Sequence, residues 1–401
     1  MSKPINSKSK QVLLTICSIA LLWQLFFPFI CYAQEPQLLK IYYPETSQIK
    51  ERFYGIIQKK DTIREGKYEF YLENGVLKQQ GQFQENQPNG HWTIFYDTGS
   101  KHQELEFANG LRNGQLIVYF PDGAIMQKGS YLNDMLHGTF QSYYPNGVLE
   151  SLSEYQNGLQ HGIMTVNYTD GTPYKIIELN QGIEHGKWRQ YYPNGHINYD
   201  GTRRNGEFHD TLKVYYENGN TKRICIYDAG QLHGPYLAYH DNGNLMIQSQ
   251  YEMDNQQGMV TEYYEDGSIQ QKGTYTNNQR DGLWVSYHRN SSVHASGYFK
   301  ENSFEGPWDV FYSNGILKQR GSYRNGKATG MWQFFFEDGS LYKLGQFISD
   351  KEQGVWLHYT QQQPNQPQRI VNYRNGKPSG PIWIYDDNGI QKHFIRAALS
   401  N

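Results

Sequence analysis

A 24-residue period runs through most of this 401-residue chain. Stretches of one kind, such as GTFQSYYPNG from Gly138 and GPWDVFYSNG from Gly306, open on a glycine and close on a turn. The opening residues of successive copies are Gly66, Gly90, Gly114, Gly138, Gly162, Gly186, Asp210, Gly234, Gly258, Gly282, Gly306, Gly330 and Gly354, and a last copy opens two residues late at Gly380. Such a strict period is typical of a repeat protein, whose units bury their apolar faces by stacking on their neighbours. The period therefore favours one elongated array over several globular domains.

Counted from the opening residue as position 0, each copy has the pattern of a β-hairpin. Position 2 is Trp or another large apolar residue, position 5 is aromatic except at Asn167, and position 6 often adds a second ring. Because side chains alternate along a strand, positions 2 and 6 should share one face and position 5 should lie on the other. Positions 8 and 9 are usually Asn or Asp followed by Gly, as in Asn146-Gly147, which predicts a type I′ turn with two positive φ angles. A second strand and a second turn, such as Asn325-Gly326, complete the unit.

The copies together predict an all-β fold. We expect an elongated solenoid of about 14 stacked antiparallel β-hairpins that form one long twisted sheet. The array should cover residues 66–395, followed by a tail at 396–401. Residues 34–65 contain Tyr42-Tyr43-Pro44, which resembles the end of a unit strand but is out of phase, so this segment is expected to be an N-terminal cap.

Three places depart from the pattern. Asp210 and Ser291 stand where other copies have glycine, and the stretch QQQPNQPQ at 361–368 should lengthen the turn of the thirteenth hairpin.

The first 33 residues differ in kind from the repeats. Three lysines precede a nearly continuous apolar run, which ends at Cys31-Tyr32-Ala33 with small residues where a signal peptidase cuts. Residues 1–33 are therefore interpreted as an export signal, and the alternative is an uncleaved membrane anchor. Cleavage would leave Cys225 as the only cysteine, so no disulfide could form within the exported chain. The mature protein is expected to be periplasmic, outer-membrane-associated or extracellular.

Composition and motifs exclude several classes of function. The chain has 37 basic and 39 acidic residues in no block of like charge, which indicates neither nucleic acid nor a membrane surface as a partner. No zinc-protease motif, paired-cysteine metal signature, P-loop or nucleophile elbow is present. We therefore expect no enzyme activity, no metal and no cofactor.

Two sets of residues stand out as candidate binding residues. Histidine directly precedes the opening residue of five successive copies, at His137, His161, His185, His209 and His233. The simpler interpretation is that His-Gly is a recurrent turn between units, and the alternative is a ligand-facing or pH-sensitive edge. Tryptophan occupies position 2 in four consecutive copies, at Trp284, Trp308, Trp332 and Trp356. These rings should pack the core, and some could also line a groove for a peptide or an extended polymer.

The unit resembles the MORN repeat variant, a 24-residue form with the pattern G-x-W-x-x-Y-Y-x-N-G followed by L-K-x-x-G-x-Y-x-N-G. The copy from Gly306 follows this pattern almost throughout. The resemblance implies an elongated, twisted hairpin solenoid that serves in protein contacts or in membrane-associated scaffolding, so contact with a membrane stays possible although the charge does not indicate it. Bacterial members of this family are often labelled antitoxins.

Three functions remain open at this stage. The first is an exported scaffold that binds a protein or a cell-envelope partner, and the absence of catalytic motifs favours it. The second is an antitoxin or immunity-type protein, although an export signal would require the toxin to be met outside the membrane. The third is a carbohydrate-binding or glycan-acting protein, for which no carboxylate pair stands out from the repeat pattern.

Overall fold

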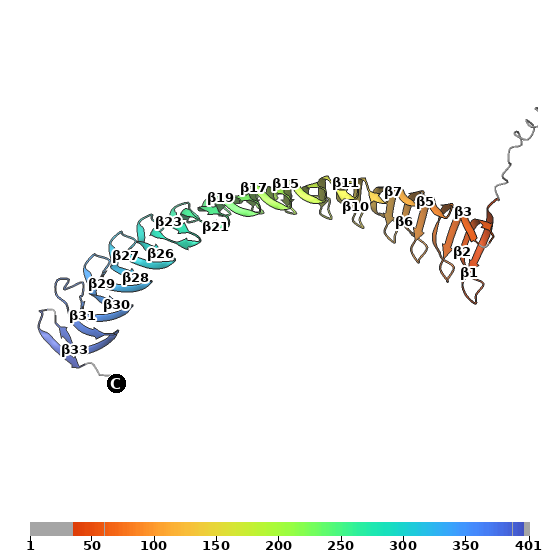
Figure 1. Cartoon of the computed structure of the whole chain (residues 1–401). Coiled ribbons are helices and arrows are strands. Elements are labelled where there is room, and N and C mark those ends of the chain that lie inside the picture. Colours follow the sequence, from red (N-terminus) through yellow and green to blue (C-terminus); the bar gives the residue numbers. More distant parts are fainter. Residues whose placement is uncertain (1–34, 60, 387, 397–401) are drawn as a thin grey trace, which may run out of the picture. The chain divides into compact units, whose positions relative to one another are not determined.

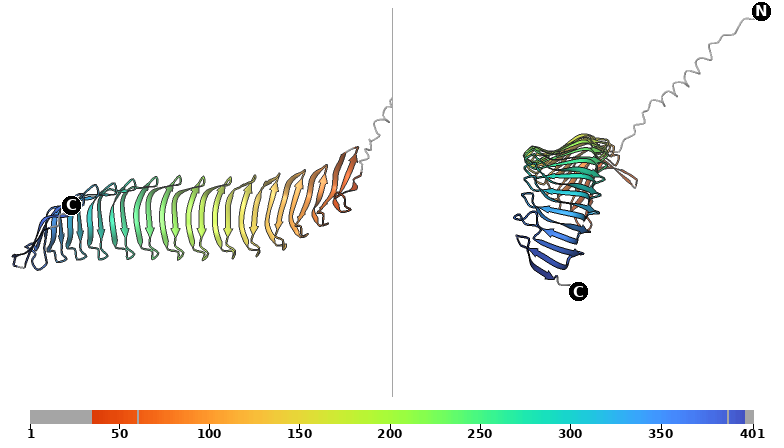
Figure 2. Two further views of the ribbon diagram at one scale, coloured as in Figure 1. Left: turned by 90° about the horizontal axis from the view of Figure 1, so that it is seen from below. Right: turned by 90° about the vertical axis from the view of Figure 1, so that its left-hand side faces the viewer.

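The computed structural model describes residues 35–59, 61–386 and 388–396, and all regular elements in this part of the chain are β-strands. The proposed export signal at 1–33 and residues 397–401 of the expected tail lie outside the described residues. The chain divides into two compact units, one up to Met135 and one from Leu136. In each unit the strands follow one another side by side in chain order (Figure 1; Figure 2).

The first unit consists of four antiparallel hairpins. Its strands are β1 (Gln37–Tyr42), β2 (Ile49–Gln58), β3 (Asp61–Tyr71), β4 (Leu77–Gln84), β5 (Gln87–Phe95), β6 (Lys101–Ala108), β7 (Leu111–Tyr119) and β8 (Ile125–Leu132), with the two-residue strand β9 (Met135–Leu136) at the division between the units.

The second unit continues the pattern with eleven hairpins. Its strands are β10 (Gly138–Tyr143), β11 (Leu149–Gln156), β12 (Leu159–Gln160), β13 (Gly162–Asn167), β14 (Pro173–Asn180), β15 (Ile183–Tyr191), β16 (Ile197–Arg204), β17 (Glu207–Tyr215), β18 (Thr221–Asp228), β19 (Gln231–Tyr239), β20 (Leu245–Glu252), β21 (Asn255–Gln256), β22 (Gly258–Tyr263), β23 (Ile269–Thr276), β24 (Gln279–Arg280), β25 (Gly282–Tyr287), β26 (Val293–Lys300), β27 (Ser303–Phe311), β28 (Leu317–Arg324), β29 (Lys327–Phe335), β30 (Leu341–Ile348), β31 (Lys351–His358), β32 (Arg369–Arg374), β33 (Lys377–Tyr385) and β34 (Gln391–Arg396).

The all-β repeat fold is confirmed, but the number of hairpins differs from the expected 14. The strands β9, β12, β21 and β24 are two-residue segments, each separated by one residue from the longer strand that follows. The 34 strands of the described chain thus form 15 hairpins. The additional hairpin is β1–β2 in the segment expected to be a cap, and it pairs with β3 as any other unit pairs with its successor. Its loop has one residue more than that of the next hairpin, and β2 and β3 are longer than the equivalent strands β4 and β5, which puts it out of phase with the repeat period.

The turns after position 6 are not of the expected type. In the unit that opens at Gly186, the Tyr192 N–H donates to the His196 carbonyl at 2.8 Å and the Gly195 N–H donates to the Tyr192 carbonyl at 2.9 Å. Gly195 has φ 85°, whereas Asn194 is not at positive φ. This is a three-residue loop that ends on a left-handed glycine, and it uses the same Asn-Gly pair as a two-residue turn. The prediction of a type I′ turn here was wrong.

The type I′ geometry occurs at the opposite edge of the sheet. Asn325 has φ 50° and Gly326 has φ 76°, so both central residues of this two-residue turn are left-handed. Ser291, one of the two departures from the glycine pattern, takes φ 65° at the end of a three-residue loop. The loop between β31 and β32 is longer than the others, as the sequence predicted.

In most units the opening residue lies inside a strand, at a β-bulge. In the units that open at Gly138, Gly162, Gly258 and Gly282 it is instead the first residue of the longer strand segment. Between β14 and β15 the register passes from Leu179↔Glu184 to Ile177↔Trp188, so three residues around Gly186 face the single residue Glu178. Gly186 has φ 111°, and a Cβ atom there would lie 2.0 Å from the Glu178 carboxylate. The period of glycines therefore records an irregularity in the strand pairing more often than the start of a strand.

Hydrogen bonds at the three-residue loops join many of the hairpins to the next within each unit. The position 6 hydroxyl donates to the position 5 carbonyl of the following unit, for example from Tyr216 to Tyr239 at 2.8 Å and from Tyr312 to Phe335 at 2.9 Å. The Asn218 side chain makes a parallel bond to the Asp241 carbonyl at 3.0 Å. These bonds satisfy backbone groups at the sheet edge, so the recurrent Tyr at position 6 fixes the stacking of units.

Candidate functional site

Most of the position 2 tryptophans are core residues. Trp284, Trp332 and Trp356 are buried, and so are the equivalent Trp92 and Trp188 in earlier units. Trp308 is the exception, because its side chain is only half-buried. Of the four tryptophans considered as binding residues, Trp308 is thus the one whose ring reaches the surface.

The buried rings of Trp284, Trp332 and Trp356 each lie on a glycine of the preceding hairpin. A Cβ atom on Gly321 would lie 2.0 Å from the Trp332 ring, and one on Gly345 would lie 2.1 Å from the Trp356 ring. These position 15 glycines are in the middle of strands, so they make room for the indole and do not form turns. The constant step from glycine to tryptophan could have revealed this packing in the sequence.

A pocket of about 210 Å³ opens beside Trp308 in the second unit. Its aromatic walls are Trp284, Phe299, Phe304 and Trp308, and the Phe304 and Trp308 rings meet edge to face with centroids 4.6 Å apart. Arg280 lies over Trp284, with Cζ 4.2 Å from the ring centroid. Gln271, Ser286 and His294 add polar groups to the lining. The pocket can therefore accept an apolar group that carries one or two hydrogen-bonding atoms.

The five histidines before the opening residues do not form turns between units. Each lies at the bulge, within or between strand segments, so the interpretation of His-Gly as a turn was wrong. Four of them are exposed, whereas His209 is half-buried between two carboxylates, with Asp228 Oδ1 3.4 Å from Nδ1 and Asp210 Oδ1 3.6 Å from Nε2. Groups of three or more His, Cys, Asp or Glu able to hold a metal do not occur in the described residues.

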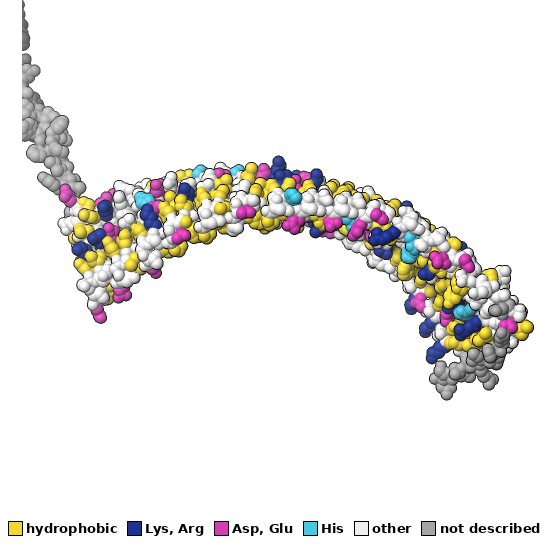
Figure 3. All heavy atoms as spheres, turned by 180° about the vertical axis from the view of Figure 1, so that it is seen from behind, with side chains coloured by type: hydrophobic (Ala, Val, Ile, Leu, Met, Phe, Trp, Pro, Cys, Tyr) yellow, Lys and Arg dark blue, Asp and Glu magenta, His cyan; other side chains and the backbone are white. Residues whose placement is uncertain are grey.

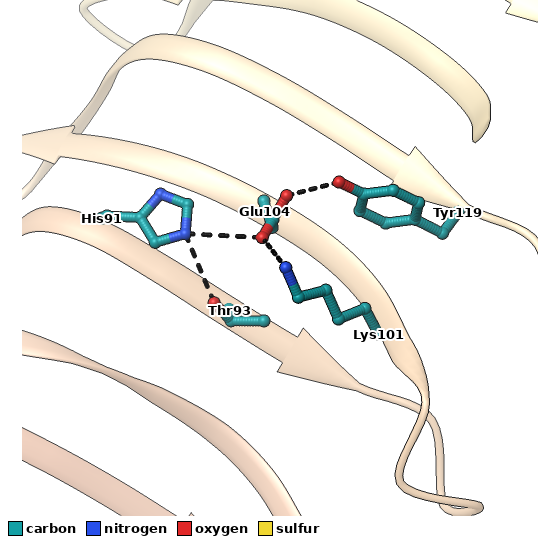
Figure 4. A network of polar contacts seen from close by, with 5 residues as sticks. All are labelled: His91, Thr93, Lys101, Glu104 and Tyr119. Carbon is teal, nitrogen blue, oxygen red and sulfur yellow. Dashed lines mark hydrogen bonds and ion pairs between the residues drawn. The ribbon is translucent and has the colours of Figure 1, made fainter. Parts of the chain in front are cut away.

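The first unit carries a polar network of His91, Thr93, Lys101, Glu104 and Tyr119 (Figure 4). His91 and Thr93 flank the buried Trp92 on β5, so their side chains stand on the face opposite its ring. Glu104 on β6 accepts hydrogen bonds from Tyr119 Oη at 2.5 Å and Lys101 Nζ at 2.6 Å, and His91 Nε2 lies 3.6 Å away. The bond to this carboxylate, together with burial, raises the pKa of Tyr119 to about 12. Burial alone would raise the pKa of Glu104, but the bonds from Lys101 and Tyr119 outweigh it and hold that pKa below its usual value.

A second carboxylate of this face is held in the same way. Glu69 is ion-paired with Arg52 and accepts a hydrogen bond from Tyr71 Oη at 2.9 Å. The bond from Arg52 is the main reason that the pKa of Glu69 is lowered. Both carboxylates therefore stay ionised and saturated with donors, which suits binding or structure better than proton transfer. Sequence reasoning missed this network, because it joins side chains of different strands that meet only through strand register.

An exposed apolar row crosses five consecutive hairpins of the second unit. It consists of the position 1 side chains Met259, Leu283, Pro307, Met331 and Val355. Met259, Met331 and Val355 each keep at least 57 % of their surface exposed, although the position 2 residue beside each of them is buried. The residues directly opposite in the paired strands are Thr274, Tyr298, Ser322, Gln346 and Asn372, and none is charged. This apolar row lies on the face that the tryptophans do not occupy, and sequence analysis had not singled it out.

A half-buried histidine in the second unit, His358, should make stability depend on pH. Burial lowers the pKa of His358 from 6.5 to about 4, and the charges of Lys343 and Arg369 act in the same direction. Between pH 6.5 and about 4, His358 is therefore protonated in the unfolded chain but neutral in the folded chain. The free energy of unfolding has its full value above pH 6.5 and decreases as the pH falls to about 4. We expect His358→Gln to reduce the loss in melting temperature between pH 7 and 4.5. An equal loss in the variant and the wild type would show that His358 does not titrate in this way.

The strand pairing and the regular units define this chain as an all-β repeat protein. The family described as MORN repeat variant matches it six times, at residues 64–85, 136–157, 184–205, 232–253, 256–277 and 304–325. These six segments therefore match the MORN repeat variant family, as their sequence pattern suggested. In the described part of the chain no helix could cross a membrane.

Other comparisons add little. No curated protein matches the sequence. Crystal structures of TcdB2-TccC3 and TcdB2-TccC3-Cdc42 are similar at 9% and 10% identity, with TM-scores of 0.17 and 0.16. The matches cover 90% and 91% of this chain but only 24% and 23% of those chains, so this chain spans about a quarter of their length. TM-scores this low carry no argument about fold or function.

Proposed function

We propose that this chain is an exported, non-catalytic repeat scaffold that binds a protein partner of the cell envelope along one face of its second unit. The apolar row carries the proposal. It places one exposed apolar side chain in each of five neighbouring hairpins, and exposed apolar side chains gathered on one face often mark a protein-binding surface. Neighbouring hairpins are about 10 Å apart, so the five residues extend over roughly 40 Å, which suits a protein surface better than a small molecule.

The surroundings of the row support an apolar partner. The side chains opposite the row are neutral, so a protein surface can cover it without burying an unpaired charge. The aromatic pocket at Trp308 lies on the other face of the same hairpins and offers a smaller second contact. The absence of catalysis is supported by Glu69 and Glu104, whose carboxylates are already engaged by basic and phenolic donors.

The double variant Met259→Gln/Met331→Gln should test the row. Both side chains are exposed, so the fold should keep its melting temperature, whereas affinity for the partner should fall by about 10-fold or more as apolar contacts are lost. Proteins from envelope extract are captured on the immobilised full chain and identified, and the affinity of each purified candidate is then measured.

Met253→Gln is the matched control, because Met253 is as exposed as the row but lies in a turn. A partner that binds the wild type and this control but not the double variant is the expected result. Equal binding by all three proteins would exclude the row, and loss of binding only in Trp308→Leu would assign the contact to the aromatic pocket.

A further inference from the structure

The two-residue turns of the last hairpins carry a concentration of positive charge. These turns join β26 to β27, β28 to β29, β30 to β31 and β32 to β33. The residues that flank them include six exposed basic side chains, here called the basic edge: Lys300, Arg324, Lys327, Lys351, Arg374 and Lys377. Figure 3 shows several Lys and Arg side chains over this end of the second unit.

Two of these turns place like charges directly opposite each other. The strand register pairs Arg324 with Lys327 and Arg374 with Lys377. Directly opposed like charges destabilise a strand pair. The equivalent turn between β16 and β17 pairs Arg204 with Glu207, so this position in the unit can hold opposite charges.

Neighbouring acids do not neutralise the basic edge by pairing. Within the described residues, none of the six side chains makes an ion pair. Asp350 Oδ1 instead accepts the Ala328 N–H at 2.6 Å, and Glu305 Oε2 accepts the Asn325 N–H at 2.7 Å. Glu301 is the remaining acid of these turns, and it is exposed.

We propose that the basic edge binds a linear polymer with repeating phosphate groups. Successive turns are about 10 Å apart, so the four turns present cations along roughly 30 Å, a pair at two of them and a single Lys300 or Lys351 at the other two. A single small anion could contact only one turn, whereas an extended chain of phosphates can contact all four. Arg and Lys are the usual phosphate-binding side chains, and a bound polyanion would remove the repulsion within the two like-charged pairs.

This site is separate from the proposed protein-binding face. The apolar row uses side chains that stand on one face of the sheet, whereas the basic edge uses the turns at its border. The two sites can therefore be tested independently on the same full chain.

The test uses inorganic polyphosphate as the probe and Lys327→Glu/Lys377→Glu as the variant. Both substitutions convert a like-charged pair into an opposite pair. We therefore expect the melting temperature without polymer to stay equal or to rise by about 1–2 °C, while affinity for polyphosphate falls by about 10-fold or more. Affinity for the wild type should also fall steeply between roughly 50 and 200 mM salt.

The matched control is Lys187→Glu/Lys213→Glu, which changes the net charge equally at exposed positions away from the edge. The control should lose no more than about 3-fold in affinity, and Met259→Gln/Met331→Gln should bind polyphosphate as the wild type does. Equal losses in the edge variant and the control would overturn the proposal, because binding would then follow net charge. Binding to vesicles with anionic lipid but not to polyphosphate, or salt-dependent dimerisation without polymer binding, would also overturn it.

Discussion

Replacing Trp356 with alanine should lower the free energy of unfolding by about 3–5 kcal/mol. The Trp356 side chain has no exposed surface, and its ring lies on Gly345 with the Phe347 centroid 4.9 Å away. A single-layer sheet has few other groups that can move into the space, so the cavity should remain largely open. Chemical denaturation would measure the loss, and hydrogen exchange in β30 and β31 would show whether it is local, because a repeat array need not unfold in one step.

Trp308→Ala is the informative comparison, since Trp308 occupies the same repeat position but is only half-buried. It should cost clearly less stability than Trp356→Ala, because less apolar surface is lost from the interior. Equal costs would mean that the exposed part of Trp308 contributes as much as a fully buried ring, which would contradict the assignment of Trp308 to a surface pocket.

The hairpin repeat could be predicted from sequence because two local signals agree. Aromatic residues at alternating positions fix which face is buried, and turn residues that recur once in every period fix where the chain reverses. The type of each turn could not be predicted, because an Asn-Gly pair fits both a two-residue turn and a three-residue loop. Asn194 takes the second form, and its side chain donates to the Glu217 carbonyl of the next hairpin at 2.8 Å. The three-residue loop at Asn194 thus occurs together with a hydrogen bond to the next hairpin, and the local sequence alone does not specify which of the two turn types forms.

The candidate sites were harder to predict, because they depend on how each unit differs from the others. Trp308 and Trp332 occupy the same repeat position, yet one is half-buried and the other is buried, since their neighbours differ. A net charge of −2 over the chain conceals the basic edge, whose members are spread along the sequence from Lys300 to Lys377. The apolar row was missed for a similar reason: a single Met or Leu per unit is ordinary until the hairpins are stacked.

Packing between units also restricts which units can be exchanged. Position 15 of one hairpin meets position 2 of the next, and the sizes of the two residues are matched. Gly273 at position 15 leaves room for the large Trp284 ring at position 2. Ser249 at position 15 is followed in the next hairpin by the smaller, buried Val260 at position 2. Trp188 is instead opposite Ile177, which shows that a ring can be accommodated in other ways. A unit is therefore compatible with a new neighbour when these two positions match.

Deleting residues 282–305 should leave a folded and shorter array. This removes one full period and brings Trp308 onto Gly273, which already accommodates the Trp284 ring. Deleting 258–281 is equally in phase but would bring Trp284 onto Ser249, where a Cβ atom occupies the space that the ring needs. We expect this second deletion to fold with a stability about 1–3 kcal/mol lower than the first, as is typical of overpacked sites.

Deleting residues 282–304, one residue fewer, should be far more damaging than either in-phase deletion. The one-residue shift moves every apolar side chain of the joined strand to the opposite face, so Trp308 would turn towards water. Circular dichroism, melting curves and hydrogen exchange across the junction would rank the three proteins. If both in-phase deletions were equally stable, the match between positions 15 and 2 would not control the stacking of hairpins. If the out-of-phase deletion folded as well as the in-phase deletions, the 24-residue repeat would not be the unit of stability.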